Sequence, residues 1–167
     1  MGLPLNSSER CAIGMQQDTS CVAEYNVMSG LDHAGIDTYY NVNDTLRYNT
    51  ISATPSAMYL NGTGWVAHNN TVLSTTTTTG IGIRVDIHGS GQTHAHHNTM
   101  TLGGSGQVFG STGGGGTALF ENNTITLTGP TNTRFDDFQV FTGLTTINNA
   151  FFGIAQFNKG LWPNEVL

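Results

Sequence analysis

The chain has 167 residues, enough for about one domain, and only 10% of them are Asp, Glu, Lys or Arg. Five basic residues against eleven acidic ones give a formal charge of −6, which excludes a basic surface that could follow a nucleic-acid backbone. No apolar run approaches the ~20 residues of a membrane span, so we expect neither nucleic acid nor a bilayer core as a partner.

Residues 1–30 carry few of the repeat features that mark the rest of the chain. We therefore expect them to form an arm or cap that precedes a solenoid of residues 31–167, because repeat arrays need their ends covered. The first ten residues lack the basic-then-apolar layout of a secretion signal. The protein is thus expected to leave its cell without a classical signal or to be released in a virion, unless the chain is a fragment.

Two cysteines, Cys11 and Cys21, lie within this N-terminal stretch. The sequence leaves three alternatives open for this pair: a disulfide that closes a small loop, a redox pair, or two unpaired thiols. Their spacing is not a zinc-binding pattern. We expect no cofactor.

A short phrase centred on Asn recurs five times after residue 45. Its copies read YNTI at 48–51, NNTV at 69–72, HNTM at 97–100, NNTI at 122–125 and NNAF at 148–151. The second residue of each copy, the anchor Asn, is followed two places later by an apolar residue: Ile51, Val72, Met100, Ile125 and Phe151. Each copy predicts a strand, a corner and a second strand, because Asn tolerates left-handed backbone geometry and its amide can bond nearby backbone. If the copies stack at the strand spacing of about 4.8 Å, the Asn amides can also bond one another in a ladder.

The anchor Asn residues lie 21 to 28 residues apart, which fits one coil of a parallel β-helix. Segments rich in Thr, Val and Ile and broken by Gly runs disfavour helices. A β-sandwich gives no reason for a repeated Asn corner, and a propeller blade needs roughly 40 residues or more per repeat. We therefore predict an all-β, right-handed parallel β-helix of about five coils with an irregular N-terminal cap or arm.

The NNTI phrase, together with Gly-apolar words such as GIGI at 80–83, resembles the repeats of the pectate-lyase-like superfamily of parallel β-helix proteins. That group includes polysaccharide lyases and hydrolases, carbohydrate-binding surface proteins and phage tailspikes. The resemblance covers about residues 46–160. It implies the fold and says little about function, because one fold hosts many activities.

Strand alternation predicts an outward cluster of titratable side chains in the middle of the array. His68, His96 and Glu121 each lie two residues before an anchor Asn, and His94 shares a face with His96. Such a cluster suits a metal site or an acid/base site, since His and Glu are good ligands. The alternative is a solvated polar face in which the rings do not converge.

Three carboxylates are candidates for catalysis. The resemblance to β-helix glycosidases draws attention to Asp136 and Asp137, since glycoside hydrolysis uses two carboxylates. Adjacent strand residues point to opposite faces, however, so this pair alone is not a site. Asp86 shares a face with His88 and is the third candidate. The full set of polygalacturonase motifs is absent, which argues against an enzyme.

Two functional hypotheses follow. The first is a non-enzymatic structural or adhesive module of an extracellular fibre or a phage or virion appendage, with glycans as candidate ligands. The alternative is a polysaccharide lyase or glycoside hydrolase, or a fragment of one, that acts on an extracellular glycan. We expect self-association or attachment to a larger particle, with the N-terminal arm at the contact, because uncapped β-helix ends invite pairing.

Overall fold

The computed structural model describes residues 11–52, 56–74, 81–87, 91–102, 107–111, 116–128, 136–137 and 143–153. In this part of the chain the regular structure consists of strands alone. It contains no helix long and apolar enough to cross a membrane. The all-β class predicted from the sequence is thereby confirmed.

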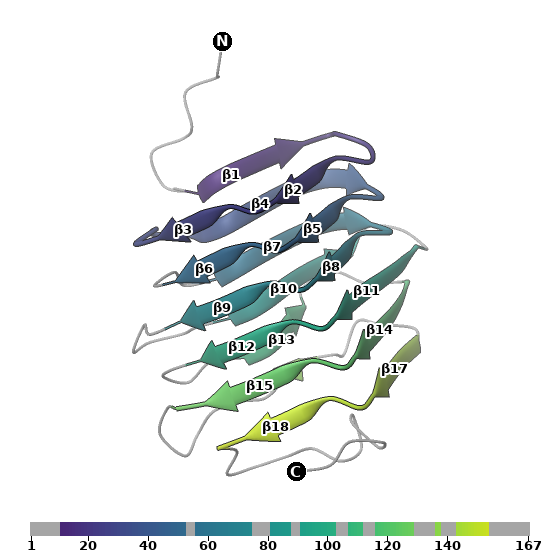
Figure 1. Cartoon of the computed structure of the whole chain (residues 1–167). Helices are drawn as coiled ribbons and strands as arrows, with labels where there is room; N and C mark the ends of the chain where they lie inside the picture. Colours follow the sequence, from purple (N-terminus) through teal and green to yellow (C-terminus); the bar gives the residue numbers. More distant parts are fainter. Residues whose placement is uncertain are drawn as a thin grey trace.

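The strands form three parallel sheets, called A, B and C, that run along one stack (Figure 1). Sheet A contains β1 (Cys11–Gln16), β4 (Ala34–Val42), β7 (Ser56–Thr63), β10 (Ile81–Ile87), β13 (Gln107–Ser111) and β16 (Asp136–Asp137). Sheet B contains β2 (Val22–Glu24), β5 (Thr45–Arg47), β8 (Val66–His68), β11 (Gln92–His96), β14 (Thr117–Glu121) and β17 (Gly143–Ile147). Sheet C contains β3 (Val27–Ser29), β6 (Thr50–Ser52), β9 (Thr71–Ser74), β12 (Thr99–Leu102), β15 (Thr124–Leu127) and β18 (Ala150–Phe152).

The chain visits sheets A, B and C in turn and then returns to A, so each coil adds one strand to every sheet. This is the predicted parallel solenoid. Among the described residues each sheet holds six strands, against the coil number of about five that the Asn repeat indicated. The difference arises at Tyr25, which begins a further copy of the phrase in which Val27 replaces the usual Thr.

The first coil lies within the stretch that we expected to be an arm or cap. Strands β1, β2 and β3 pair in parallel with β4, β5 and β6. Residues 11–29 are therefore part of the solenoid and occupy its N-terminal end, as Figure 1 shows.

Two columns of inward side chains fill the core beside the corner between sheets B and C. The column that follows the anchor Asn is at most 7% exposed and consists of Met28, Ile51, Val72, Met100, Ile125 and Phe151. The column that precedes it is equally buried and consists of Ala23, Leu46, Ala67, Ala95, Phe120 and Thr146. Strand alternation places these residues inward and their neighbours outward, as predicted. Burial of this apolar surface stabilises the stack by roughly 25 cal/mol for each Å² removed from water.

The corner between sheets B and C uses a left-handed residue in every coil. Its φ angles lie between 52° and 58°, and the residues are Tyr25, Tyr48, Asn69, His97, Asn122 and Asn148. The prediction assigned this geometry to the anchor Asn, whereas the structure places it one residue earlier. The NN doublets therefore divide two roles, in which the first Asn makes the turn and the second faces inward.

The corner between sheets A and B also uses left-handed residues, which are Ser20, Asn43 and Gly64 in the first three coils. Gly64 has a φ of 72°, and a Cβ there would lie 2.3 Å from Oδ1 of Asn43 in the preceding coil. Glycine at this position therefore leaves room for the Asn43 side chain.

Candidate functional site

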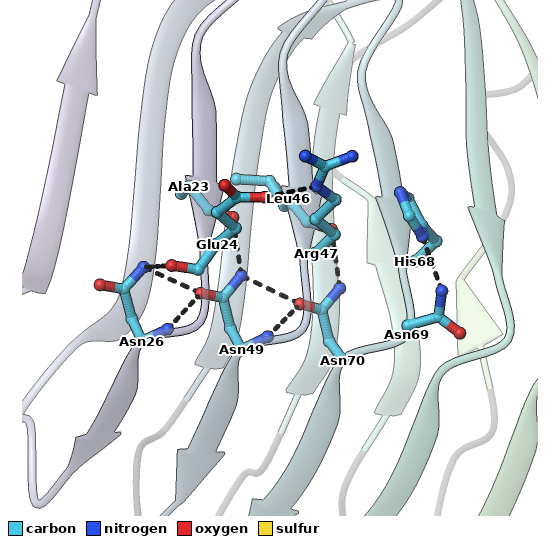
Figure 2. Close-up of polar contacts among 9 residues, drawn as sticks. All are labelled: Ala23, Glu24, Asn26, Leu46, Arg47, Asn49, His68, Asn69 and Asn70. Atoms are coloured by element: carbon cyan, nitrogen blue, oxygen red, sulfur yellow. Dashed lines mark hydrogen bonds and ion pairs between the residues drawn. The ribbon is translucent and has the colours of Figure 1, made fainter.

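The anchor Asn side chains form a continuous hydrogen-bonded ladder along the corner between sheets B and C, and Figure 2 shows its first three members. In each step the Nδ2 group of one Asn donates to Oδ1 of the next, at 2.7–3.0 Å. The ladder consists of Asn26, Asn49, Asn70, Asn98, Asn123 and Asn149. The predicted superposition of Asn49, Asn70, Asn98 and Asn123 at one corner is confirmed.

From Asn49 onward, each ladder amide also forms two hydrogen bonds with the backbone of the preceding coil. Asn70 donates a second hydrogen bond from Nδ2 to the Leu46 carbonyl of the preceding coil, at 2.9 Å. Its Oδ1 accepts from the backbone N–H of Asn49 as well as from the Asn49 side chain. The buried amides are thereby satisfied, which removes the penalty for burying polar groups. The ladder holds the corner in register and so fixes the residues that point outward beside it.

Those outward residues form a patch that we call the imidazole face. It spans the outer side of sheet B and the adjoining corner, and it consists of Glu24, Tyr25, Arg47, Tyr48, His68, His94, His96, His97 and Glu121. The strand register aligns Arg47, His68, His96 and Glu121 in one column across four successive coils. The surface is continuous because each coil adds the next member of this column.

Four rings of the imidazole face contact one another in sequence. Tyr25 and Tyr48 stack with centroids 5.0 Å apart, and Tyr48 meets His68 edge-on at 5.8 Å. The His68 and His96 rings are parallel within 3°, with centroids 4.8 Å apart. We call this series the ring row. Because Tyr25 stacks on Tyr48 and His68 stacks on His96, the row exposes ring edges over several coils, with Tyr25 71% exposed at its end.

Polar contacts hold the side chains around the ring row. His94 Nε2 lies 3.0 Å from Glu121 Oε1, and both side chains are 27% exposed. Arg47 Nε donates to Glu24 Oε2 at 2.6 Å, as Figure 2 shows. The two ion pairs occupy opposite ends of the face, one in the first two coils and one between β11 and β14.

Two histidines beside each other also share a hydrogen bond. Nδ1 of His96 lies 2.9 Å from Nδ1 of His97, so one ring donates a proton that the other accepts. The His94 and His97 rings both contact His96, at centroid distances of 4.4 and 5.2 Å. His96 is therefore the centre of the cluster.

The environment of the face disfavours charged imidazoles. Partial burial, together with His94, His68 and His97, lowers the pKa of His96 to about 4, against the opposing effect of Glu121. Partial burial also lowers the pKa of His68, with smaller effects from Arg47, His94 and His97. Near pH 7 these two rings are therefore neutral, which suits the face-to-face stacking of His68 on His96.

The structure brings together the four residues predicted to form a cluster, namely His68, His94, His96 and Glu121. Their contacts are ring stacking and hydrogen bonds. Within the described ranges, no group of three or more His, Cys, Asp and Glu side chains has an arrangement that could hold a metal ion.

Sequence reasoning missed Glu24, Tyr25 and His97. Tyr25 and His97 occupy the left-handed position just before an anchor Asn. Strict alternation would turn that position inward, but the corner rotates it toward solvent. The six copies have only Tyr, Asn or His at this position, and the absence of aliphatic residues there is the signal that could have found the two rings.

The three candidate catalytic carboxylates lie in sheet A. Asp86 is in β10, where its register partner is Asn61, and Asp136 and Asp137 form β16. Arg84 of β10 pairs with Gly110 of β13, and Gly110 pairs with Asp137 of β16. Asp137 is therefore in the column of Arg84, two strands from β10. Asp86 and Asp137 are thus in different columns of one sheet. Their catalytic role stays a prediction.

Cys21 is a free thiol in the structure, so it forms no disulfide with Cys11. Desolvation raises the pKa of Cys21, and the Asp18 and Asp44 carboxylates raise it further. The thiolate is the reactive form of cysteine, so this environment disfavours nucleophilic or redox chemistry at Cys21.

Comparison of the chain with models of known protein families, with curated proteins and with solved structures finds no match.

Proposed function

We propose that the protein is a non-enzymatic structural or adhesive module of an extracellular fibre or a virion appendage, related to the pectate-lyase-like superfamily, and that its imidazole face binds glycans. The single observation that carries the proposal is the ring row, which displays stacked aromatic and imidazole rings across four coils.

The Asn ladder supports the structural part of the proposal. Ladder and core columns repeat in every coil, so each coil is held by its neighbours in the same way. Such an array keeps outward side chains at fixed spacing along the stack. A regular display of this kind suits attachment to a repetitive ligand.

The chemistry of the imidazole face supports a glycan as that ligand. A sugar residue presents C–H groups on its ring faces and hydroxyls at its edges. Tyr25 and Tyr48 offer exposed rings to the former, while Glu24, Arg47 and the histidines offer hydrogen bonds to the latter. Exposed aromatic patches with a polar rim are typical of interaction sites.

Binding to an array of neutral oligosaccharides at pH 7 tests this proposal, followed by titration of a bound glycan. We expect the double variant Tyr25→Ala/Tyr48→Ala to lose at least about tenfold in affinity, since aromatic anchors dominate binding. Tyr39→Ala is the matched control, because Tyr39 is also an exposed tyrosine and lies within β4 of sheet A, whereas the imidazole face lies on sheet B. Absence of bound glycans, or equal binding by the double variant, would refute the proposal. Release of shortened oligosaccharides would favour the lyase or hydrolase alternative.

We also propose that the protein self-associates through its first coil. Val22 and Val27 are 54% and 83% exposed, whereas the next coil carries Thr45 and Thr50 at the same positions. Exposed valines in the end strands of sheets B and C favour contact with a second copy. The double variant Val22→Thr/Val27→Thr copies the neighbouring coil and should convert an oligomer into a monomer in sedimentation experiments. A wild-type protein that is monomeric at all concentrations would contradict this idea.

A further inference from the structure

We propose that the imidazole face binds acidic polysaccharides, which carry sulfate or carboxylate groups, and that mild acid strengthens this binding because the bound anions draw protons onto its histidines. The inference rests on the proposed function, since it names the ligand class and the regulation of the same surface.

Histidines are concentrated on this face. The chain has six histidines, and four of them lie here: the rings of His68, His94 and His97 each contact the ring of His96. One of the five basic residues, Arg47, lies beside them. A chain whose formal charge is −6 thus places most of its acid-dependent positive charge on one surface.

The charged groups of the face change their balance when its imidazoles take up protons. At neutral pH, Arg47 of β5 faces Glu24 of β2, while Glu121 of β14 faces His94 of β11. One arginine against two glutamates leaves a small negative excess. The other titratable groups of the face are the phenols of Tyr25 and Tyr48. Protonation of the imidazoles reverses the sign, so the face then attracts anions.

The spacing of the rings favours a polymer with repeated charges. His68 and His96 lie on adjacent coils with centroids 4.8 Å apart, and His94 and His97 flank His96. Successive positive charges would follow the solenoid axis at about the length of one sugar residue in an extended chain. The ring row continues along the same line to Tyr25 and can contact the sugar rings.

Partial burial and neighbouring positive charges both oppose protonation of the imidazoles. Burial, followed by the neighbouring histidines, lowers the pKa of His96 to about 4, and burial, followed by Arg47 and the neighbouring histidines, lowers that of His68. A bound anion would relieve this repulsion, so binding must be accompanied by proton uptake. Proton uptake is a signature that contact with a neutral sugar would not produce.

The test compares dextran sulfate with unsulfated dextran by calorimetric titration at about pH 8 and about pH 6. The lower pH stays above the sequence pI of about 5.3, so the whole protein remains anionic. We expect affinity for dextran sulfate to rise at least about tenfold on acidification and to fall with added salt. Heats measured in two buffers of different ionisation enthalpy should show proton uptake by the wild-type protein at pH 6.

His94→Gln/His96→Gln should abolish the rise while retaining the sheet, because both side chains point outward. His33→Gln is the matched control, since His33 contacts Asp37 and Tyr59 away from this face. An equal rise in the double variant, or binding without proton uptake by the wild-type protein, would overturn the inference. Equal binding of unsulfated dextran or of single-stranded DNA would overturn the assigned ligand class. Loss of neutral-glycan binding in the tyrosine variants tests the proposed function separately.

Discussion

At the scale of single residues, Asn98 shows how one amide can join three coils. It donates to the Ala67 carbonyl and to Asn123 Oδ1, and its own Oδ1 accepts from Asn70. Truncation in Asn98→Ala leaves buried groups unpaired on both sides. Each unpaired group costs roughly 1–3 kcal/mol, so we expect the free energy of unfolding to fall by about 3 kcal/mol. Urea denaturation at neutral pH measures this loss.

Asn69→Gly is the control for that substitution. Asn69 is exposed and has a φ of 54°, which glycine adopts without strain. We expect its unfolding free energy to change by less than ~0.5 kcal/mol. Similar losses in Asn98→Ala and Asn69→Gly would show that the ladder contributes nothing specific.

The residue scale also shows what the sequence could reveal of the site. Spacing from the anchor Asn predicted the ladder and the outward direction of His68, His94, His96 and Glu121. It could not place His97, because alternation fails where the backbone becomes left-handed. The left-handed turn at His97 depends on contacts between neighbouring coils. The sequence of a single coil carries no information about those contacts.

At the scale of elements, the core column after the anchor Asn links β3, β6, β9, β12, β15 and β18. Met100 of β12 is fully buried between Val72 and Ile125 in register. Met100→Ala should leave a cavity between neighbouring coils and cost about 2–5 kcal/mol of unfolding free energy. Thr99→Ser changes the exposed residue next to it and should cost less than ~0.5 kcal/mol. A loss below that value in Met100→Ala would contradict the buried column.

The first coil marks the limit of prediction at this scale. Its phrase, YNVM at 25–28, retains the anchor Asn and the apolar residue two places later. Val27 replaces Thr, and the preceding strand has Val22 facing solvent, so polar alternation is lost there. The sequence repeat was hard to recognise in this coil because its outward residues, which packing does not constrain, differ from those of the other copies. Its inward residues follow the same pattern as in the other copies.

At the scale of the whole molecule, the imidazole face links stability to pH. His96 and His68 have lower pKa values in the folded protein than in an unfolded chain, where histidine titrates near pH 6.5. The unfolded chain therefore binds more protons as the pH falls below about 6.5. Stability is fully present above that pH and decreases until the folded His96 titrates at about pH 4.

Because the His96 ring is only partly shielded from water, we expect this group to cost about 1 kcal/mol between pH 7 and pH 4. His96→Gln should reduce the acid-induced loss by about that amount, as measured by urea denaturation at several pH values. His33→Gln again provides the control. A steeper loss in His96→Gln than in the wild-type protein would contradict the sign of the effect.

The Asn ladder also has a consequence for chemical ageing. Asn side chains deamidate when the backbone nitrogen of the following residue attacks the amide carbon and forms a succinimide ring. In this solenoid that nitrogen is already a hydrogen-bond donor to the preceding coil's anchor carbonyl, as in Thr71 to Asn49 and Thr99 to Asn70. The residue after each ladder Asn is also never glycine. Folded protein stored for weeks at alkaline pH should therefore keep these amides by peptide mass analysis, whereas urea-unfolded protein should lose them.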